Sequence, residues 1–334
     1  MATRKKSKLK LVISPGLARS GTTYLYHNLF ENHPYLFNFG PSKELNFFDR
    51  SHDPAKFRAL FDTPDDSKYY IDYSPAYLCD SRRAIDNIIA FPALEKKIIL
   101  HLRHPVEQFF AHYLHDIKAH YAPRQFDKVH SPLFSETIAR NYMALRGQAV
   151  ERLVGAVGLE NILVVNFHKD LGAAGLHSRV GNFLGAELTP FRNEVIGGGG
   201  WTPYYIYAHA DPVDVAIGSK VYALPPQHLL LVNNADSCVW PDVDPATALQ
   251  VLAGATTWSR QIIPQEFDVL FEAFRADWLK TLDLLGQDPD DYNVPRHMVS
   301  RLATLPESMA GCLYDPRPIG AVLQAAASQR GTGG

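Results

Sequence analysis

The feature that most constrains the fold is a glycine-bounded loop near the start of the sequence. Leu9 to Ile13 is a short apolar run, and Thr22 to Asn32 has apolar residues at helical spacing. Between them, four residues separate Gly16 from Gly21. Glycines let a backbone turn tightly enough for several N–H groups to converge on one anion, and the start of a helix adds partial positive charge. The pattern therefore predicts a strand, a phosphate-binding loop and a helix.

Apolar strand-like runs alternate with helical patterns in the first half of the chain, which is typical of a parallel sheet flanked by helices. We predict further strands over 69–73, 97–102 and 161–166, and helices from about 105 and over 135–157, 175–184 and 264–286. The fold class is therefore α/β with a P-loop-type central parallel sheet. An irregular insertion occupies about 192–262 of the C-terminal half. We expect a basic lead-in over 1–8, one α/β domain over 9–295, and a C-terminal extension over 296–334 whose end is disordered.

Composition excludes several classes of protein. The chain has 33 Lys and Arg against 35 Asp and Glu, a net charge of −2, which argues against a basic nucleic-acid binder. Its three cysteines, Cys79, Cys238 and Cys312, are widely spaced, so they predict neither a disulfide framework nor a zinc site. No apolar run approaches the roughly 18 residues of a membrane span. The basic N-terminus lacks a signal-peptide apolar run. We expect a cytoplasmic protein without nucleic-acid partners; its oligomeric state is not predicted.

The loop departs from a nucleotide-binding Walker A motif at one position. That motif has Lys directly after the second glycine, where this chain has Thr22. The cation within the loop is instead Arg19, two residues before Gly21. The missing lysine weakens the case for a Mg–ATP site, because that lysine contacts the β- and γ-phosphates.

The segment Gly-Leu-Ala-Arg-Ser-Gly-Thr-Thr from Gly16 to Thr23 closely resembles the 5′-phosphosulfate loop of sulfotransferases. These enzymes use 3′-phosphoadenosine 5′-phosphosulfate (PAPS) as sulfuryl donor. The arginine form is more similar to the carbohydrate and bacterial branches than to the cytosolic phenol and steroid branch. The resemblance implies that Arg19 binds the sulfuryl group and that Ser20, Gly21, Thr22 and Thr23 bind the 5′-phosphate. Since a sulfuryl group is less negative than a γ-phosphoryl group, cations and amides suffice without a metal.

A second strand–helix junction resembles the family's 3′-phosphate segment, which is a strand ending in Arg, then x-Pro, then a helix carrying Arg, Ser and Tyr. Arg103, Pro105 and Tyr113 match this pattern. Gln108 stands where the family often has Arg, and Ala111 where it usually has Ser. The resemblance implies that Arg103 and the Ala111 position belong to the donor site, with a weaker 3′-phosphate contact because the serine is missing.

Two segments resemble the acceptor side of carbohydrate-type sulfotransferases. Lys43-Glu-Leu-Asn-Phe-Phe matches the family's Lys-Glu-x-x-Phe-Phe, which implies that Glu44 is the general base and that Lys43 stabilises charge on the transferred group. A surface salt bridge between the two is the alternative. Asp72-Tyr-Ser-Pro-Ala-Tyr matches a segment in which Ser74 and Tyr77 contact the substrate or orient Glu44.

The insertion contains a further candidate binding residue. Four consecutive glycines, 197–200, precede Trp201 and several tyrosines. In the family a loop over this part of the chain closes on the adenosine and the 3′-phosphate. Trp201 is therefore a candidate for stacking on adenine or on a ring of the substrate. A flexible linker before an aromatic core strand is the alternative.

The resemblance predicts in-line sulfuryl transfer from PAPS to a hydroxyl of a small-molecule or carbohydrate acceptor, with a carboxylate base. Two alternatives stay open at this point. One is a P-loop kinase or other nucleotide-binding protein, which requires Mg²⁺. The other is a binding protein that keeps the sulfotransferase fold without catalysis, a possibility that Gln108 and Ala111 keep open.

Overall fold

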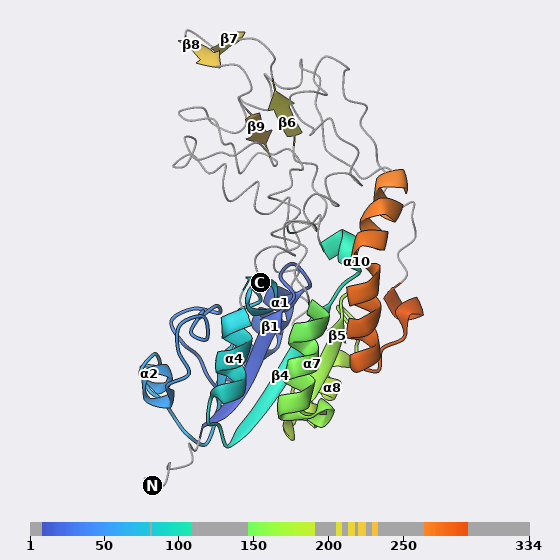
Figure 1. Cartoon of the computed structure of the whole chain (residues 1–334). Coiled ribbons are helices and arrows are strands. Elements are labelled where there is room, and N and C mark those ends of the chain that lie inside the picture. The colour runs from blue at the N-terminus through green and yellow to red at the C-terminus, as the bar shows by residue number, and fades with distance from the viewer. Residues whose placement is uncertain are drawn as a thin grey trace. The chain divides into compact units, whose positions relative to one another are not determined.

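In the computed structural model, the chain forms two compact units (Figure 1). One unit contains residues 1–108, 143–198 and 274–293, and the other contains the rest. The structure describes residues 9–80, 82–108, 112, 146–190, 205–208, 213–217, 220–224, 229–232 and 264–292. Several predictions fall outside these residues, among them the lead-in 1–8, the extension 296–334, and the positions Ala111, Tyr113 and Trp201.

The first unit is built on a five-stranded sheet in which every pairing is parallel. Its strand order is β2-β3-β1-β4-β5. The strands are β1 (Lys10–Gly16), β2 (Phe37–Asn38), β3 (Tyr69–Asp72), β4 (Glu95–Leu102) and β5 (Ile162–Asn166). In the central register, Val12 lies opposite Ile71 on one side and Lys97 on the other. This arrangement confirms the predicted α/β class with a parallel sheet.

Helices bury both faces of this sheet, as expected for parallel strands. On one face, the side chains of Val12, Ile71 and Ile99 join a core cluster with α1 (Thr22–Asn28) and α8 (Leu176–Leu184). Helices α4 (Arg82–Ala90) and α7 (Arg146–Val157) lie in front of the sheet in Figure 1.

Most predicted elements are present, with shifted ends. The helix predicted over 22–32 divides into α1 and the 3₁₀ helix η1 (Phe30–Asn32), with Leu29 between them at φ −115°. Of the helix predicted over 135–157, the described part is α7. The remaining described helices of this unit are short: α2 (Pro54–Arg58), α3 (Tyr77–Asp80), η3 (Leu159–Asn161), η4 (Pro289–Tyr292) and residues 105–108.

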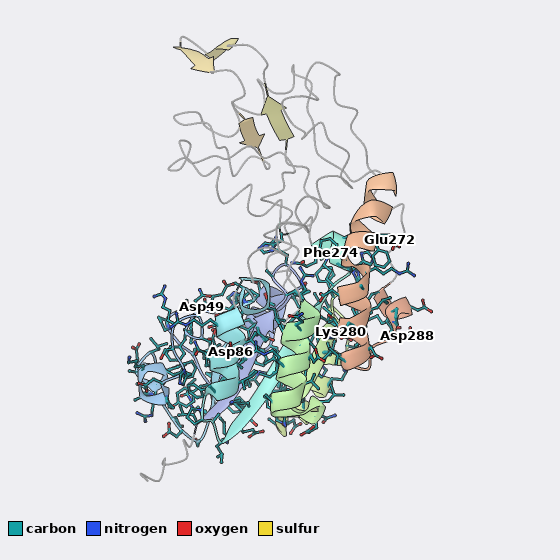
Figure 2. All side chains as sticks on the ribbon, in the orientation of Figure 1. Asp49, Asp86, Glu272, Phe274, Lys280 and Asp288 are labelled. Atoms are coloured by element: carbon teal, nitrogen blue, oxygen red, sulfur yellow. The ribbon has the colours of Figure 1, made fainter. Side chains whose placement is uncertain are left out.

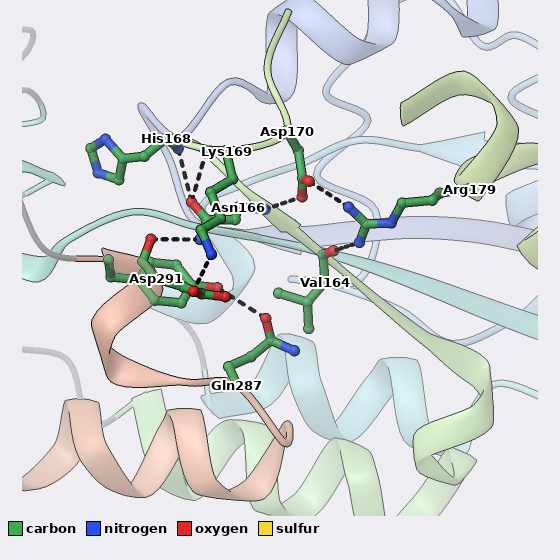
Figure 3. A network of polar contacts seen from close by, with 9 residues as sticks. Val164, Asn166, His168, Lys169, Asp170, Arg179, Gln287 and Asp291 are labelled. Atoms are coloured by element: carbon green, nitrogen blue, oxygen red, sulfur yellow. Dashed lines mark hydrogen bonds and ion pairs between the residues drawn. The ribbon is translucent and has the colours of Figure 1, made fainter. Parts of the chain in front are cut away.

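The C-terminal helix α10 (Pro264–Leu284) packs into the first unit over its second half. Lys280, labelled in Figure 2, forms an ion pair of 2.6 Å with Glu151 of α7. Beyond the helix, Asp291 accepts a hydrogen bond from the Asn166 side chain through its carbonyl and forms an ion pair with Lys169 (Figure 3). These contacts tie the end of the chain's described part to the end of β5.

The second unit contains four described strands in a region for which the sequence predicted no regular structure. Strands β6 (Tyr205–Ala208) and β9 (Leu229–Val232) pair antiparallel. Strands β7 (Val213–Ile217) and β8 (Lys220–Leu224) form a second antiparallel pair. The sequence carries a signal for this second pair, since two β-rich runs flank Gly218-Ser219.

Candidate functional site

The phosphate-loop sequence follows β1 directly, and its two glycines are sterically required. Gly16 has φ 156°, and a Cβ there would lie 2.9 Å from Cβ of Leu78. Gly21 has φ 86°, and a Cβ there would overlap the side chain of Leu171. Arg19 also lies in the left-handed region, at φ 60°, which few residues other than glycine adopt. Glycine at positions 16 and 21 therefore permits a loop conformation that a residue with a side chain would disturb.

Three buried side chains hold three consecutive carbonyls of this loop. Gln108 donates through Nε2 to the carbonyl of Ala18 at 2.9 Å. Arg103 donates through Nη1 to the carbonyl of Arg19 at 3.0 Å, and Nδ1 of His101 lies 3.2 Å from the carbonyl of Ser20. All three donors lie on β4 or in the residues that follow it. Because a trans peptide places its C=O and N–H on opposite sides, the next N–H in each case faces away from these side chains.

The N–H groups on the opposite side of the loop have no protein acceptor within the described ranges. No backbone N–H from Arg19 to Thr23 has an acceptor among the described residues, and no side chain caps α1. Ser20 and Thr22 are buried. N–H groups at the start of a helix, together with its partial positive charge, can bind a ligand that accepts hydrogen bonds. A phosphate or sulfate oxygen is such an acceptor, so the residues present fit the 5′-phosphosulfate of PAPS.

His101 braces the loop as a neutral imidazole. Burial lowers its pKa to about 3. A carbonyl only accepts hydrogen bonds, so Nδ1 carries the proton toward Ser20, and Nε2 accepts from the Tyr73 hydroxyl at 3.0 Å. Burial also raises the pKa of Tyr73 well above its ordinary value. The pair therefore keeps fixed protonation states at neutral pH and supports the loop.

Arg103 is anchored within the protein. Its side chain is packed over the ring of Phe167, and its Nε lies 3.2 Å from Oε2 of Glu107. Nε2 of His168 lies 3.2 Å from the same carboxylate oxygen. Burial opposes ionisation of Glu107, but the His168 hydrogen bond and the Arg103 charge hold its pKa below the ordinary value. Two guanidinium donors of Arg103 are thus used by Arg19 and Glu107.

The predicted Lys43–Glu44 pair lies beside the phosphate loop. Nζ of Lys43 is 3.4 Å from Oγ1 of Thr22 and 2.8 Å from Oε1 of Glu44. The Lys43 side chain is 13% exposed, whereas that of Glu44 is 44% exposed. The structure therefore joins two segments that were identified separately in the sequence. It leaves the Glu44 carboxylate accessible to a ligand while the lysine is enclosed.

A fully buried carboxylate holds the loop that carries Glu44. Oδ1 of Asp72 accepts from Ser74 at 2.5 Å, and Oδ2 accepts from Tyr77 at 2.7 Å. The two hydroxyl oxygens accept in turn from the backbone N–H groups of Asn46 and Phe48, at 3.0 and 3.1 Å. Burial raises the pKa of Asp72 to about 6.

Ser74 and Tyr77 are themselves buried. Of the two roles expected for them, this geometry supports orienting Glu44 over contacting the substrate.

Neither a scan against protein-family models nor a search of curated proteins gave a match. Among solved structures, a sulfotransferase from Alicyclobacillus acidocaldarius matches with a TM-score of 0.50 and 17% identity, over 85% of this chain and 98% of that one. This chain shares its fold. The sulfotransferase domain of an olefin synthase from Synechococcus PCC 7002 matches with a TM-score of 0.32 and 18% identity, over 56% of this chain and 78% of that one. The resemblance stated from the sequence is thus confirmed for the fold.

Sequence reasoning missed several residues of the site. It assigned no role to Asp72 or to His101, and it treated Gln108 only as a departure from the family's pattern. Arg146, which contacts Gln108, was not considered. Two of these residues carried a usable signal, since polar side chains at the ends of parallel strands gather at the binding edge of such sheets. Asp72 ends β3, and His101 lies one residue before the end of β4.

The described residues were compared with the requirements of a metal site and of a membrane span. No group of three or more His, Cys, Asp or Glu side chains in them is placed to hold a metal ion. None of their helices has the length and apolar character needed to cross a bilayer.

Proposed function

We propose that this protein transfers a sulfuryl group from PAPS to a hydroxyl group of a small-molecule or carbohydrate acceptor. The observation that carries the proposal is the row of N–H groups from Arg19 to Thr23, which have no acceptor in the described part of the chain. The carbonyls of the same loop accept hydrogen bonds from Gln108, Arg103 and His101 on its other side. The position of Lys43 and Glu44 beside that row supports it. The fold shared with a bacterial sulfotransferase agrees with it.

The loop residues would bind the donor. The backbone from Ser20 to Thr23 and the hydroxyls of Thr22 and Thr23 would hold the 5′-phosphate, in the tight turn that Gly16 and Gly21 permit. Arg19 would contact the sulfuryl group and the oxygen that bridges it to the phosphate. When bound, PAPS supplies a sulfuryl group already activated by its phosphate leaving group. Arg103 would add positive charge to the donor site while it holds the Arg19 carbonyl.

Glu44 would act as the general base. Its carboxylate is accessible and is held by Lys43 near the start of α1. Glu44 would take the proton of the acceptor hydroxyl as that oxygen forms its bond to sulfur. At the same time the bond between sulfur and the bridging oxygen of the phosphate would break. Lys43 would stabilise negative charge on the transferring group. Ser74 and Tyr77 would position Glu44, since their buried hydroxyls accept from the backbone of Asn46 and Phe48 and are themselves held by Asp72.

The test is a calorimetric titration with adenosine 3′,5′-bisphosphate, the product that remains after sulfuryl transfer. Wild-type protein and Arg19→Ala are each titrated in chelator, and in parallel with ATP and Mg²⁺. We expect micromolar binding of the bisphosphate without metal, and its loss in Arg19→Ala. Metal-dependent ATP binding without bisphosphate binding would contradict the proposal and favour a kinase. Binding of the bisphosphate without transfer to any acceptor in a broad panel would favour a non-catalytic protein.

A further inference from the structure

A buried arginine contacts the phosphate loop through a single glutamine. Arg146, at the start of the described part of α7, is 6% exposed, and its Nη2 donates to Oε1 of Gln108 at 2.6 Å. Gln108 is fully buried and donates through Nε2 to the Ala18 carbonyl at 2.9 Å. The three groups form a continuous line of hydrogen bonds from α7 into the loop. The proposed function uses Gln108 only as a donor to the Ala18 carbonyl and does not use Arg146.

The chemistry of the two ends fixes the orientation of the Gln108 amide. A guanidinium only donates hydrogen bonds and a carbonyl only accepts them. The amide must therefore turn Oε1 toward Arg146 and Nε2 toward Ala18, and the flipped orientation would break both bonds. A side chain that lacks either the acceptor or the donor cannot make this connection. Arg146 thus determines which way the Gln108 donor points.

Among the described residues, no carboxylate serves as a close counterion for Arg146. It forms no ion pair with any carboxylate in the described part of the chain, and its Nε has no hydrogen-bond partner there. A buried charge without a partner is costly unless other groups compensate it. Gln108 places this charge two hydrogen bonds from the loop. An anion bound to the loop would be attracted to it, in a protein that has Thr22 at the position of the Walker lysine.

The backbone of Arg146 is itself held in place by α10. Asp277 accepts hydrogen bonds from the backbone N–H groups of Arg146 at 3.0 Å and Gly147 at 2.9 Å. A Cβ on Gly147 would lie 2.9 Å from Oδ1 of Asp277, so glycine permits this close approach. The Asp277 carboxylate is therefore used by the backbone of α7. This anchor keeps the Arg146 side chain in reach of Gln108.

We propose that Arg146 and Gln108 are positioning residues for donor binding, an inference that rests on the proposed function. Gln108 holds the Ala18 carbonyl so that the N–H of Arg19 faces the bound anion. Arg146 fixes the Gln108 amide and adds positive charge behind the loop. Each residue acts through the other, and neither touches the reacting atoms.

The experiment measures binding of adenosine 3′,5′-bisphosphate to Gln108→Met, Arg146→Met and the double variant by calorimetry. Methionine matches glutamine in length, keeps most of the aliphatic part of arginine, and removes the hydrogen bonds and the charge. The matched control is Arg152→Met, which changes a more exposed arginine of the same helix that pairs with Asp86. Circular dichroism establishes that each variant is folded at the temperature of the titration.

We expect each single variant to bind the bisphosphate at least about tenfold more weakly than wild type, with Arg152→Met unchanged. The double variant should bind about as weakly as either single variant, because residues that act as one unit are not additive. Folded single variants with wild-type affinity would overturn the proposal. Independent, additive losses would overturn the coupling between the two residues.

A second arm with inorganic pyrophosphate separates this inference from the proposed function. If wild type binds pyrophosphate but not the bisphosphate, the donor assignment is wrong. The same variants then test the relay with pyrophosphate, and a tenfold loss supports it. If wild type binds neither anion, the loop is not an anion site and both proposals fail.

Discussion

The buried carboxylate of Asp72 should make the stability of this protein depend on pH in an unusual direction. Burial raises its pKa to about 6 in the folded protein, compared with about 3.9 in an unfolded chain. An acid whose pKa rises on folding favours the folded state while it is protonated. The stabilisation is fully present below the unfolded pKa and is lost as the pH rises through 6.

The size of the effect follows from these two pKa values. Between pH 7 and pH 5 the folded protein takes up nearly one proton at Asp72, whereas the unfolded chain takes up almost none. Integrating this difference gives about 1.4 kcal/mol of added stability at pH 5 relative to pH 7. Asp72→Asn cannot take up this proton, so it should lack the gain. It should also be less stable than wild type at pH 7 by about 1–3 kcal/mol, because Asn offers one acceptor oxygen to the hydroxyls of Ser74 and Tyr77.

The assay is urea unfolding of wild type and Asp72→Asn at pH 5, 6 and 7, with the difference between the two proteins compared across pH. Asp66→Asn is the control, because hydrogen bonds from Tyr70 and Arg58 lower the pKa of Asp66 and leave it ionised over this range. The difference for Asp72→Asn should widen by about 1.4 kcal/mol from pH 7 to pH 5, while that for Asp66→Asn stays constant. Parallel pH profiles of wild type and Asp72→Asn would refute the reasoning.

Three further predictions concern the loop and the proposed base. Arg19→Ala should lose most sulfuryl transfer and most bisphosphate affinity, because its charge lies within the loop; unchanged values of both would contradict its role. Glu44→Gln should lower kcat at least about a hundredfold with little change in the bisphosphate Kd, and a full rate on a true acceptor would remove Glu44 as the base. Gly21→Ala should destabilise the protein by at least about 1–2 kcal/mol, because φ is positive and Leu171 fills the space. Its control, Gly155→Ala in α7, has open space around it and should be neutral or stabilising in the same urea assay.

The sequence predicted those parts of the fold whose causes are local. The positions of Gly16 and Gly21 between an apolar run and a helical pattern were sufficient to place the loop. Continuous apolar runs were sufficient to place β4 and β5. The two residues of β2, by contrast, are too few to give a periodic signal, and they pair with β3 at the edge of the sheet.

The supporting contacts of the site could not be predicted from the sequence in the same way. Arg146 lies 38 residues from Gln108, and Gln108 lies 90 residues from Ala18. The contact of Arg146 with Gln108 depends on how α7 packs. The contact of Gln108 with Ala18 depends on how the residues after β4 approach the loop, and no local pattern encodes either arrangement. The Lys43–Glu44 pair was identified only through its resemblance to the family, and its proximity to Thr22 is a result of the tertiary fold. Ser74 and Tyr77 were predicted as site residues with either of two roles, and their burial, which favours the positioning role, is a property of the tertiary fold.

The most direct test of the central claim is a crystal structure of the protein with adenosine 3′,5′-bisphosphate, grown without metal. The account predicts that the 5′-phosphate oxygens lie within about 2.7–3.1 Å of the backbone nitrogens from Ser20 to Thr23. It also predicts that Gln108, Arg103 and His101 still hold the three carbonyls behind them. A bisphosphate bound elsewhere, with these N–H groups facing water or protein, would contradict the account.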